Sequence, residues 1–78
     1  MADTKERVIK IIADQLGKDA TEINEKTDIP NDLGADSLDL AELLISFEEE
    51  FNINIDEQDA QNLVTVGDVI AAVSKATN

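Results

Sequence analysis

The stretch LGADSLDL, residues 33–40, places a serine where a loop leads into an apolar run with helical spacing. A helix start carries partial positive charge and unpaired N–H groups, which suit a phosphate group. A serine at such a place is more commonly a helix cap, because its oxygen accepts an amide proton of the first turn. Helix position alone therefore favours capping by Ser37 and leaves a phosphoester attachment site as the second interpretation.

The composition excludes several kinds of chemistry. The 78 residues include no His and no Cys, and no Lys lies near Ser37 in the sequence. A Ser-His-Asp arrangement, a disulfide framework and a thiolate metal site are therefore excluded. No run of about 18 apolar residues is present, and the N-terminal MADTKERV lacks the apolar core of a signal peptide. We expect a soluble intracellular protein that is not an enzyme.

The net charge of −12 is unevenly distributed along the chain. Residues 1–26 hold six acidic and five basic side chains, whereas residues 27–78 hold twelve acidic side chains and a single base, Lys75. Such an acidic surface repels nucleic acid and anionic lipid and accelerates encounter with basic surfaces. The charge pattern therefore predicts a partner with a basic surface and no nucleic-acid partner.

Helical periodicity predicts a first helix over residues 4–16. Asp3 and Glu6 have capping-box spacing, and Gly17 stands where a left-handed C-cap belongs. Residues 17–35 form a long connection, in which the closely spaced Pro30 and Gly34 argue against regular structure. Connections of this length in small domains are uncommon and usually functional.

Three further helices are expected in the second half of the chain. They span residues 37–51, with Asp36 as N-cap, a short segment over 57–62, and a segment from Thr65, as N-cap, to about residue 75. Three longer helices, one short helix and a long first loop predict an all-α fold, a small antiparallel four-helix bundle.

The helix over 37–51 carries more apolar residues than one buried face needs. With successive residues about 100° apart, one stripe lies within about 60° of Leu40 and is assigned to the core. It consists of Leu40, Leu43, Leu44, Phe47 and Phe51. A second set, Leu38, Ala41 and Ile45, falls nearly opposite and is bordered by carboxylates. That outer set is typical of a helix that docks into a partner groove edged by Lys and Arg.

The stretch DLGADSLD at 32–39, followed by EEEF at 48–51, resembles an acyl carrier protein of dissociated, type II fatty acid synthesis. The similarity extends to ERVIKIIADQLG at 6–17 and TVGDVIAAV at 65–73, and so covers essentially the whole chain. The resemblance implies a single acyl-carrier domain over residues 1–78 with the four-helix fold. It also raises attachment at Ser37 above capping as the interpretation of that serine.

The resemblance further implies a cofactor and a set of site residues. Ser37 would carry 4′-phosphopantetheine, transferred from coenzyme A by a Mg²⁺-dependent carrier synthase, and the arm's thiol would hold acyl intermediates as thioesters. The residues that match partner-facing positions of the family are Asp36, Leu38, Asp39, Glu42, Ile45 and Glu48, with Glu49, Ile55 and Glu57 as lesser candidates. The acyl chain would be sheltered near Leu40, Leu43, Leu44, Val64 and Ile70.

Implied partners are the carrier synthase (phosphopantetheinyl transferase), acyl transferases, ketoacyl synthases, reductases and dehydratases with basic docking grooves. A monomer is expected, in the bacterial cytoplasm or, if processed, in an organelle stroma or matrix. The chain departs from common family residues in several places, with Leu40 where Thr or Val is frequent, Ala41 for Val, Ile45 for Met and Asp56 for Pro. These departures concern pocket depth and partner preference, and they leave open a specialised carrier for lipid A, polyketide or another acyl pathway.

Two functions of other classes remain as alternatives. A calcium-binding loop that begins at Asp28 would need Asp or Asn, Gly and Glu at its third, sixth and twelfth positions. The chain has Pro30, Leu33 and Asp39 there, which does not match. The other alternative is an acidic interaction module without a cofactor, which would lack the mass of an attached arm.

Overall fold

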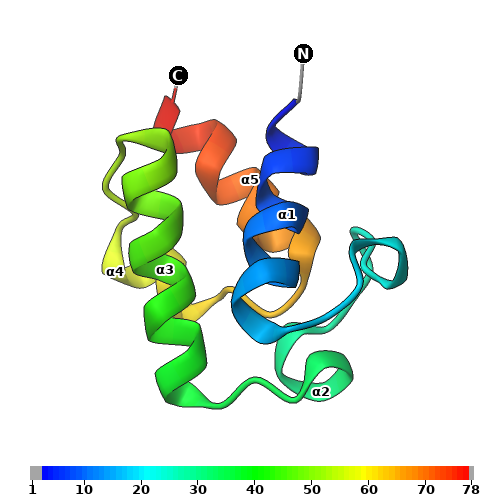
Figure 1. The fold of residues 1–78 in the computed structure, drawn as a ribbon. Helices are drawn as coiled ribbons and strands as arrows, with labels where there is room; N and C mark the ends of the chain where they lie inside the picture. Colours follow the sequence, from blue (N-terminus) through cyan, green and yellow to red (C-terminus); the bar gives the residue numbers. More distant parts are fainter. Residues whose placement is uncertain (1–2, 78) are drawn as a thin grey trace.

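The structure, a computed structural model, describes residues 3–77 and is helical (Figure 1). Its elements are α1 (Thr4–Leu16), a 3-10 turn η1 (Ala20–Glu22), α2 (Ile29–Leu33), α3 (Ser37–Phe51), α4 (Glu57–Gln61) and α5 (Val66–Thr77). The three longer helices α1, α3 and α5 form the body of the bundle, and α1 runs antiparallel to α3 (Figure 1). The predicted all-α bundle with three longer helices is confirmed.

The ends of α1 and α3 lie where the sequence places them. The Asp3 side chain accepts a hydrogen bond from the Glu6 backbone N–H at 2.8 Å, and Gly17 closes α1 in the left-handed region with φ of 65°. The bounds of the two later helices differ slightly from prediction, since α4 ends at Gln61 and α5 continues to Thr77.

The connection between α1 and α3 is more ordered than predicted. The expectation that Pro30 and Gly34 exclude regular structure is wrong, because residues 29–33 form α2. Pro30 lies in the first turn of α2, where a backbone N–H has no intrahelical partner to lose. The Asp28 side chain caps the helix by accepting from the Asn31 backbone N–H at 2.9 Å, and Gly34 ends it with φ of 69°.

The core contains residues from all three longer helices and from the connection between α1 and α3. Its buried apolar residues are Val8, Ile12, Ala13, Ile23, Ile29, Ala35, Leu43, Phe47, Ile55, Val66, Val69 and Val73. Backbone hydrogen bonds fasten the connection to the segment before α5, from Ile29 N to Val64 O at 2.8 Å and from Val66 N to Thr27 O at 3.0 Å. The connection therefore covers one end of the core.

Two charged side chains, Arg7 and Asp68, stabilise helix ends through hydrogen bonds. Arg7, the only arginine of the chain, lies 4.4 Å from the centre of the Phe51 ring and bonds Glu50 Oε2 at 2.8 Å, which ties α1 to the end of α3. At the start of α5, Asp68 Oδ2 accepts from the backbone N–H groups of Thr65 and Val64 at 3.0 and 3.1 Å. These hydrogen bonds lower the pKa of the Asp68 carboxyl below its usual value.

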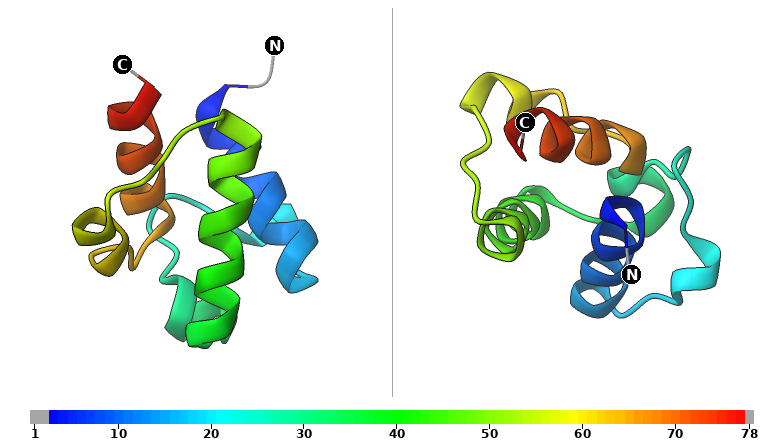
Figure 2. Two further views of the ribbon diagram at one scale, coloured as in Figure 1. Left: turned by 90° about the vertical axis from the view of Figure 1, so that its left-hand side faces the viewer. Right: turned by 90° about the horizontal axis from the view of Figure 1, so that it is seen from above.

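The ends of the bundle differ in what they present. The start of α1 and the end of α5 lie at one end, whereas the start of α3 lies at the opposite end beside α2 (Figures 1 and 2). Among residues 3–77, no helix is long and apolar enough to cross a bilayer. Within the same residues, no group of three or more acidic, His or Cys side chains is arranged to hold a metal ion.

Candidate functional site

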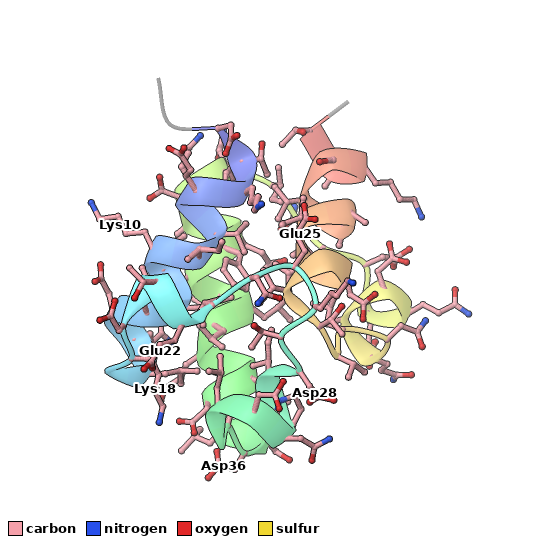
Figure 3. All side chains as sticks on the ribbon, turned by 90° about the vertical axis from the view of Figure 1, so that its right-hand side faces the viewer. Lys10, Lys18, Glu22, Glu25, Asp28 and Asp36 are labelled. Carbon is pink, nitrogen blue, oxygen red and sulfur yellow. The ribbon has the colours of Figure 1, made fainter. Side chains whose placement is uncertain are left out.

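Ser37 occupies the first position of α3, and its neighbour Asp36 performs the capping. Asp36 Oδ1 accepts from the Asp39 backbone N–H at 2.9 Å, and Asp39 Oδ2 accepts from the Asp36 backbone N–H at 3.2 Å. This reciprocal pair is a capping box, and it fixes the backbone on both sides of Ser37. Asp36 lies at the exposed lower end of the molecule in Figure 3.

The Ser37 hydroxyl is available for chemistry because the cap does not use it. Ser37 is exposed, and its hydroxyl takes part in no hydrogen bond among the described residues 3–77. A phosphoester on this oxygen would extend into solvent, beside the positive end of a helix of fifteen residues. The site therefore fits a covalently attached phosphate group, and the capping interpretation belongs to Asp36 instead.

The outward face of α3 is apolar, as the helical spacing predicts. Leu38 is 67% exposed and Ile45 is 55% exposed, whereas Leu43 and Phe47 on the opposite face are each 1% exposed. Ala41 is exposed between Leu38 and Ile45. The stripe of Leu38, Ala41 and Ile45 is called the outer stripe below.

The predicted partner-facing acids fall into two groups. Glu42, Glu49 and Glu57 are exposed, and their side chains form no hydrogen bond or ion pair with another of residues 3–77. Glu48, in contrast, is half-buried, and its Oε2 accepts from the Ile55 backbone N–H at 2.8 Å. Its carboxylate therefore holds the chain that follows α3.

Three further residues predicted to face partners are placed differently from the exposed acids. Ile55 is a poor candidate for a partner-facing residue, because its side chain is only 8% exposed and belongs to the core. Asp36 and Asp39 remain near the surface, but their carboxylates are already used in the capping box.

A pocket of about 430 Å³ begins at Ser37 and passes between α3 and α4. Its lining residues are Ile29, Ser37, Leu40, Ala41, Leu43, Leu44, Phe47, Glu57, Ala60, Gln61, Leu63 and Val69. Of these, Ile29, Leu43, Phe47 and Val69 are each about 1% exposed, so the inner part of the pocket is apolar. Figure 2 shows α4 beside α5, on the side of the bundle away from α1.

The five residues predicted for the acyl pocket lie in different places relative to this pocket. Leu40, Leu43 and Leu44 line the pocket, but Val64 and Ile70 do not. Val64 is 43% exposed in the loop before α5, and Leu63 lines the pocket next to it. On α5 the lining residue is Val69, one position before Ile70, because helical rotation turns Ile70 away.

Residues 6–73 match the model of the phosphopantetheine attachment site family, called PP-binding. The chain belongs to this family. It is therefore a carrier with a covalent 4′-phosphopantetheine group, and it has no catalytic role of its own. Its partners include a phosphopantetheinyl transferase and enzymes that handle acyl groups.

Solved structures of acyl carrier proteins resemble the bundle over most of its length. A Mycobacterium tuberculosis protein assigned as an acyl carrier protein is 38% identical, with a TM-score of 0.88 over 94% of this chain and 97% of that one. The acyl carrier protein from Enterococcus faecalis is 29% identical, with a TM-score of 0.79 over 94% and 92%. The apo doublet acyl carrier protein from prodigiosin biosynthesis is 27% identical, with a TM-score of 0.81 over 94% and 35%.

Proposed function

We propose that Ser37 carries the 4′-phosphopantetheine arm. Three observations support this assignment, namely the exposed hydroxyl at the first position of α3, its absence from the hydrogen bonds within residues 3–77, and the pocket that begins beside it. In the attachment step, Ser37 Oγ forms a new bond to phosphorus while the pyrophosphate bond of coenzyme A breaks. Adenosine 3′,5′-bisphosphate leaves. The hydroxyl proton passes to a base on the transferase, because this carrier contains no His.

The attached arm supplies the thiol that forms acyl thioesters, which a chain without Cys cannot supply itself. The residues of the carrier then serve to present and shelter the cargo. The capping box of Asp36 and Asp39 holds the start of α3 in position. The pocket beside Ser37 would receive the acyl chain along Leu40, Leu43 and Leu44.

The pathway that we propose is fatty acid biosynthesis, with the single domain over residues 1–78 acting as a monomer in a bacterial cytoplasm. The apolar pocket and the acidic surface around α3 support a general acyl carrier. A specialised pathway is the second candidate, and the likeness to the doublet carrier from prodigiosin biosynthesis favours it. Release and mass analysis of the thioester-bound acyl groups from the native source separate the two pathways.

Attachment is tested by incubation with coenzyme A, Mg²⁺ and a phosphopantetheinyl transferase, followed by intact mass measurement. We expect a gain of about 340 Da, the mass of the arm, in the wild type and none in Ser37→Ala. The matched control is Ser74→Ala, because Ser74 is an exposed serine on α5. Modification of Ser37→Ala at the wild-type rate would overturn the assignment.

We propose that the outer stripe, flanked by Glu42 and Glu49, docks into basic grooves on partner enzymes. The proposed partners are the transferase, acyl transferases, ketoacyl synthases, reductases and dehydratases. The two acids lie seven residues apart on α3, which corresponds to about 10 Å along the helix axis. Both carboxylates are exposed and form no hydrogen bond or ion pair within residues 3–77. A Lys or Arg of a partner enzyme can therefore pair with them without displacing another cation.

Charge reversal at Glu42 tests this docking surface. We expect Glu42→Lys to raise KM for acyl transfer and the deficit to shrink as salt is added, because screening weakens the new repulsion. The control is Glu22→Lys, which makes the same charge change at an exposed acid in η1 of the connection, outside α3. Equal deficits in the two variants would contradict a specific surface on α3.

A further inference from the structure

The pocket beside Ser37 has an apolar interior and a rim that is polar on one side only. Besides Ser37, the polar lining residues are Glu57 and Gln61, and both belong to α4. They are exposed, in contrast to the buried Phe47 and Val69 deeper in the pocket. The polar groups of the lining are therefore gathered at the mouth.

The two polar side chains are placed to act together. They are four residues apart in α4, so they lie on one face of the helix, one turn from each other. Neither side chain is hydrogen-bonded to another residue within the described range 3–77. Beyond Ser37, the α3 residues that line the pocket are all apolar, so α4 supplies the remaining polar contacts of the lining.

We propose that Gln61 and Glu57 are specificity-determining residues that favour acyl chains with a hydroxyl near the thioester, such as 3-hydroxyacyl groups. The inference rests on the proposed attachment at Ser37. An acyl chain tethered there enters with its methyl end first. Its apolar tail then contacts the buried residues, and the carbons nearest the thioester lie at the mouth, beside α4.

Hydrogen-bond chemistry selects the hydroxyl from among the common acyl substituents. The Glu57 carboxylate only accepts hydrogen bonds, whereas the Gln61 amide both donates and accepts. A hydroxyl donates to one side chain and accepts from the other, and a ketone can use only the Gln61 amide. A saturated chain removes water from both side chains and forms no hydrogen bond with them. Part of the free-energy cost of that desolvation is then not compensated.

The experiment loads the carrier from decanoyl-coenzyme A or 3-hydroxydecanoyl-coenzyme A and measures cleavage of each thioester by hydroxylamine. A sheltered thioester is cleaved more slowly, so the cleavage rate reports how well the acyl chain is held. We expect Gln61→Leu to accelerate cleavage of the 3-hydroxydecanoyl form about three- to tenfold relative to the decanoyl form, the effect of losing about one hydrogen bond. Glu57→Leu changes the same ratio in the same direction.

The matched control is Gln58→Leu, because Gln58 is an exposed glutamine of the same helix that does not line the pocket. It should leave the ratio of the two rates unchanged. An equal change in both rates by Gln61→Leu, or no change in either, overturns the inference. If the acyl arm is attached at Ser37 but the two thioesters respond equally to the substitution, only this inference is overturned. If no acyl arm is attached at Ser37, the proposed attachment is overturned as well.

Discussion

The two faces of α3 carry similar apolar residues that differ in burial. Leu43 and Phe47 face inward and are almost fully buried, while Leu38 and Ile45 face outward and are more than half exposed. Both sets lie on one continuous helix of fifteen residues. The inner set is explained by the core. The bundle gains little from the outer set, whose apolar character is therefore available for a contact outside the chain.

The carboxylates of α3 divide in the same way. Glu50 bonds Arg7 of α1, and Glu48 holds the Ile55 backbone N–H, so both contribute to the fold. Glu42 and Glu49 border the outer stripe, and neither carboxylate is hydrogen-bonded to another of residues 3–77. Adjacent residues of the same type, such as Glu48 and Glu49, therefore have different roles that depend on the direction in which each side chain points.

The largest expected effect is on the inner face, in Phe47→Ala. Removal of a buried phenylalanine typically costs about 3–5 kcal/mol of unfolding free energy, a large part of what a domain of this size possesses. We expect Phe47→Ala to be largely unfolded or to melt far below the wild type, as measured by circular dichroism during heating. A melting temperature close to that of the wild type would contradict the assignment of Phe47 to the core.

The next largest effect is expected for Glu48→Ala, which should lower the unfolding free energy more than Glu49→Ala does. Loss of the Glu48 carboxylate leaves the half-buried Ile55 N–H without its partner, which should cost about 1–2 kcal/mol. Glu49→Ala removes an exposed side chain and should change stability by less than about 0.5 kcal/mol. Urea unfolding of both variants gives the two values. Equal losses would show that the outward acid is also part of the fold.

A smaller effect is expected from pH at Asp68, another carboxylate that serves the fold. Its folded-state pKa is lowered below 3.8 by hydrogen bonds from the backbone of Thr65 and Val64. The stabilisation is therefore fully present above pH 3.8 and is lost as the pH falls through the lowered pKa. We expect the stability advantage of the wild type over Asp68→Asn to shrink below pH 3.8, as measured by urea unfolding at a series of pH values. An advantage that is unchanged down to pH 2 would contradict this role.

The smallest effect on stability is expected for Ile45→Ala on the outer stripe. An exposed substitution usually changes the unfolding free energy by less than about 0.5 kcal/mol. If the stripe supplies uniform binding to partner enzymes, KM for acyl transfer should rise more than kcat falls. Melting curves and transfer kinetics of one preparation test both statements. Wild-type kinetics with several partners would show that the outer stripe is not the docking surface.

The sequence alone predicts the longer helices and the direction of each face of α3. Local signals suffice there, because caps such as Asp3 and Asp36 and the periodicity of about 100° per residue act within one helix. The helix α2 was missed, although Asp28 as cap, Pro30 in the first turn and Gly34 at the end are together a helix signal. Pro30 is compatible with this helix because it lies in the first turn, where proline is tolerated.

The remaining differences concern contacts between elements. The resemblance implies Val64 and Ile70 as acyl-pocket residues, whereas Leu63 before α5 and Val69 on α5 line the pocket beside Ser37. The burial of Ile55 depends on how residues 52–56 cross the bundle, and Glu48 fixes that path with a hydrogen bond seven residues along the chain. Such choices depend on three-dimensional packing, which no pattern within one helix encodes.

The placement of the chain ends has a practical consequence for engineering. The start of α1 and the end of α5 lie at the end of the bundle opposite the start of α3 (Figure 1), where Ser37 is the first helical residue. A flexible Gly/Ser linker at either terminus behaves as a random coil and imposes little direction on what it joins. The domain can therefore be immobilised on a surface, or several copies can be joined in tandem, with the start of each α3 at the end of the bundle away from the tether.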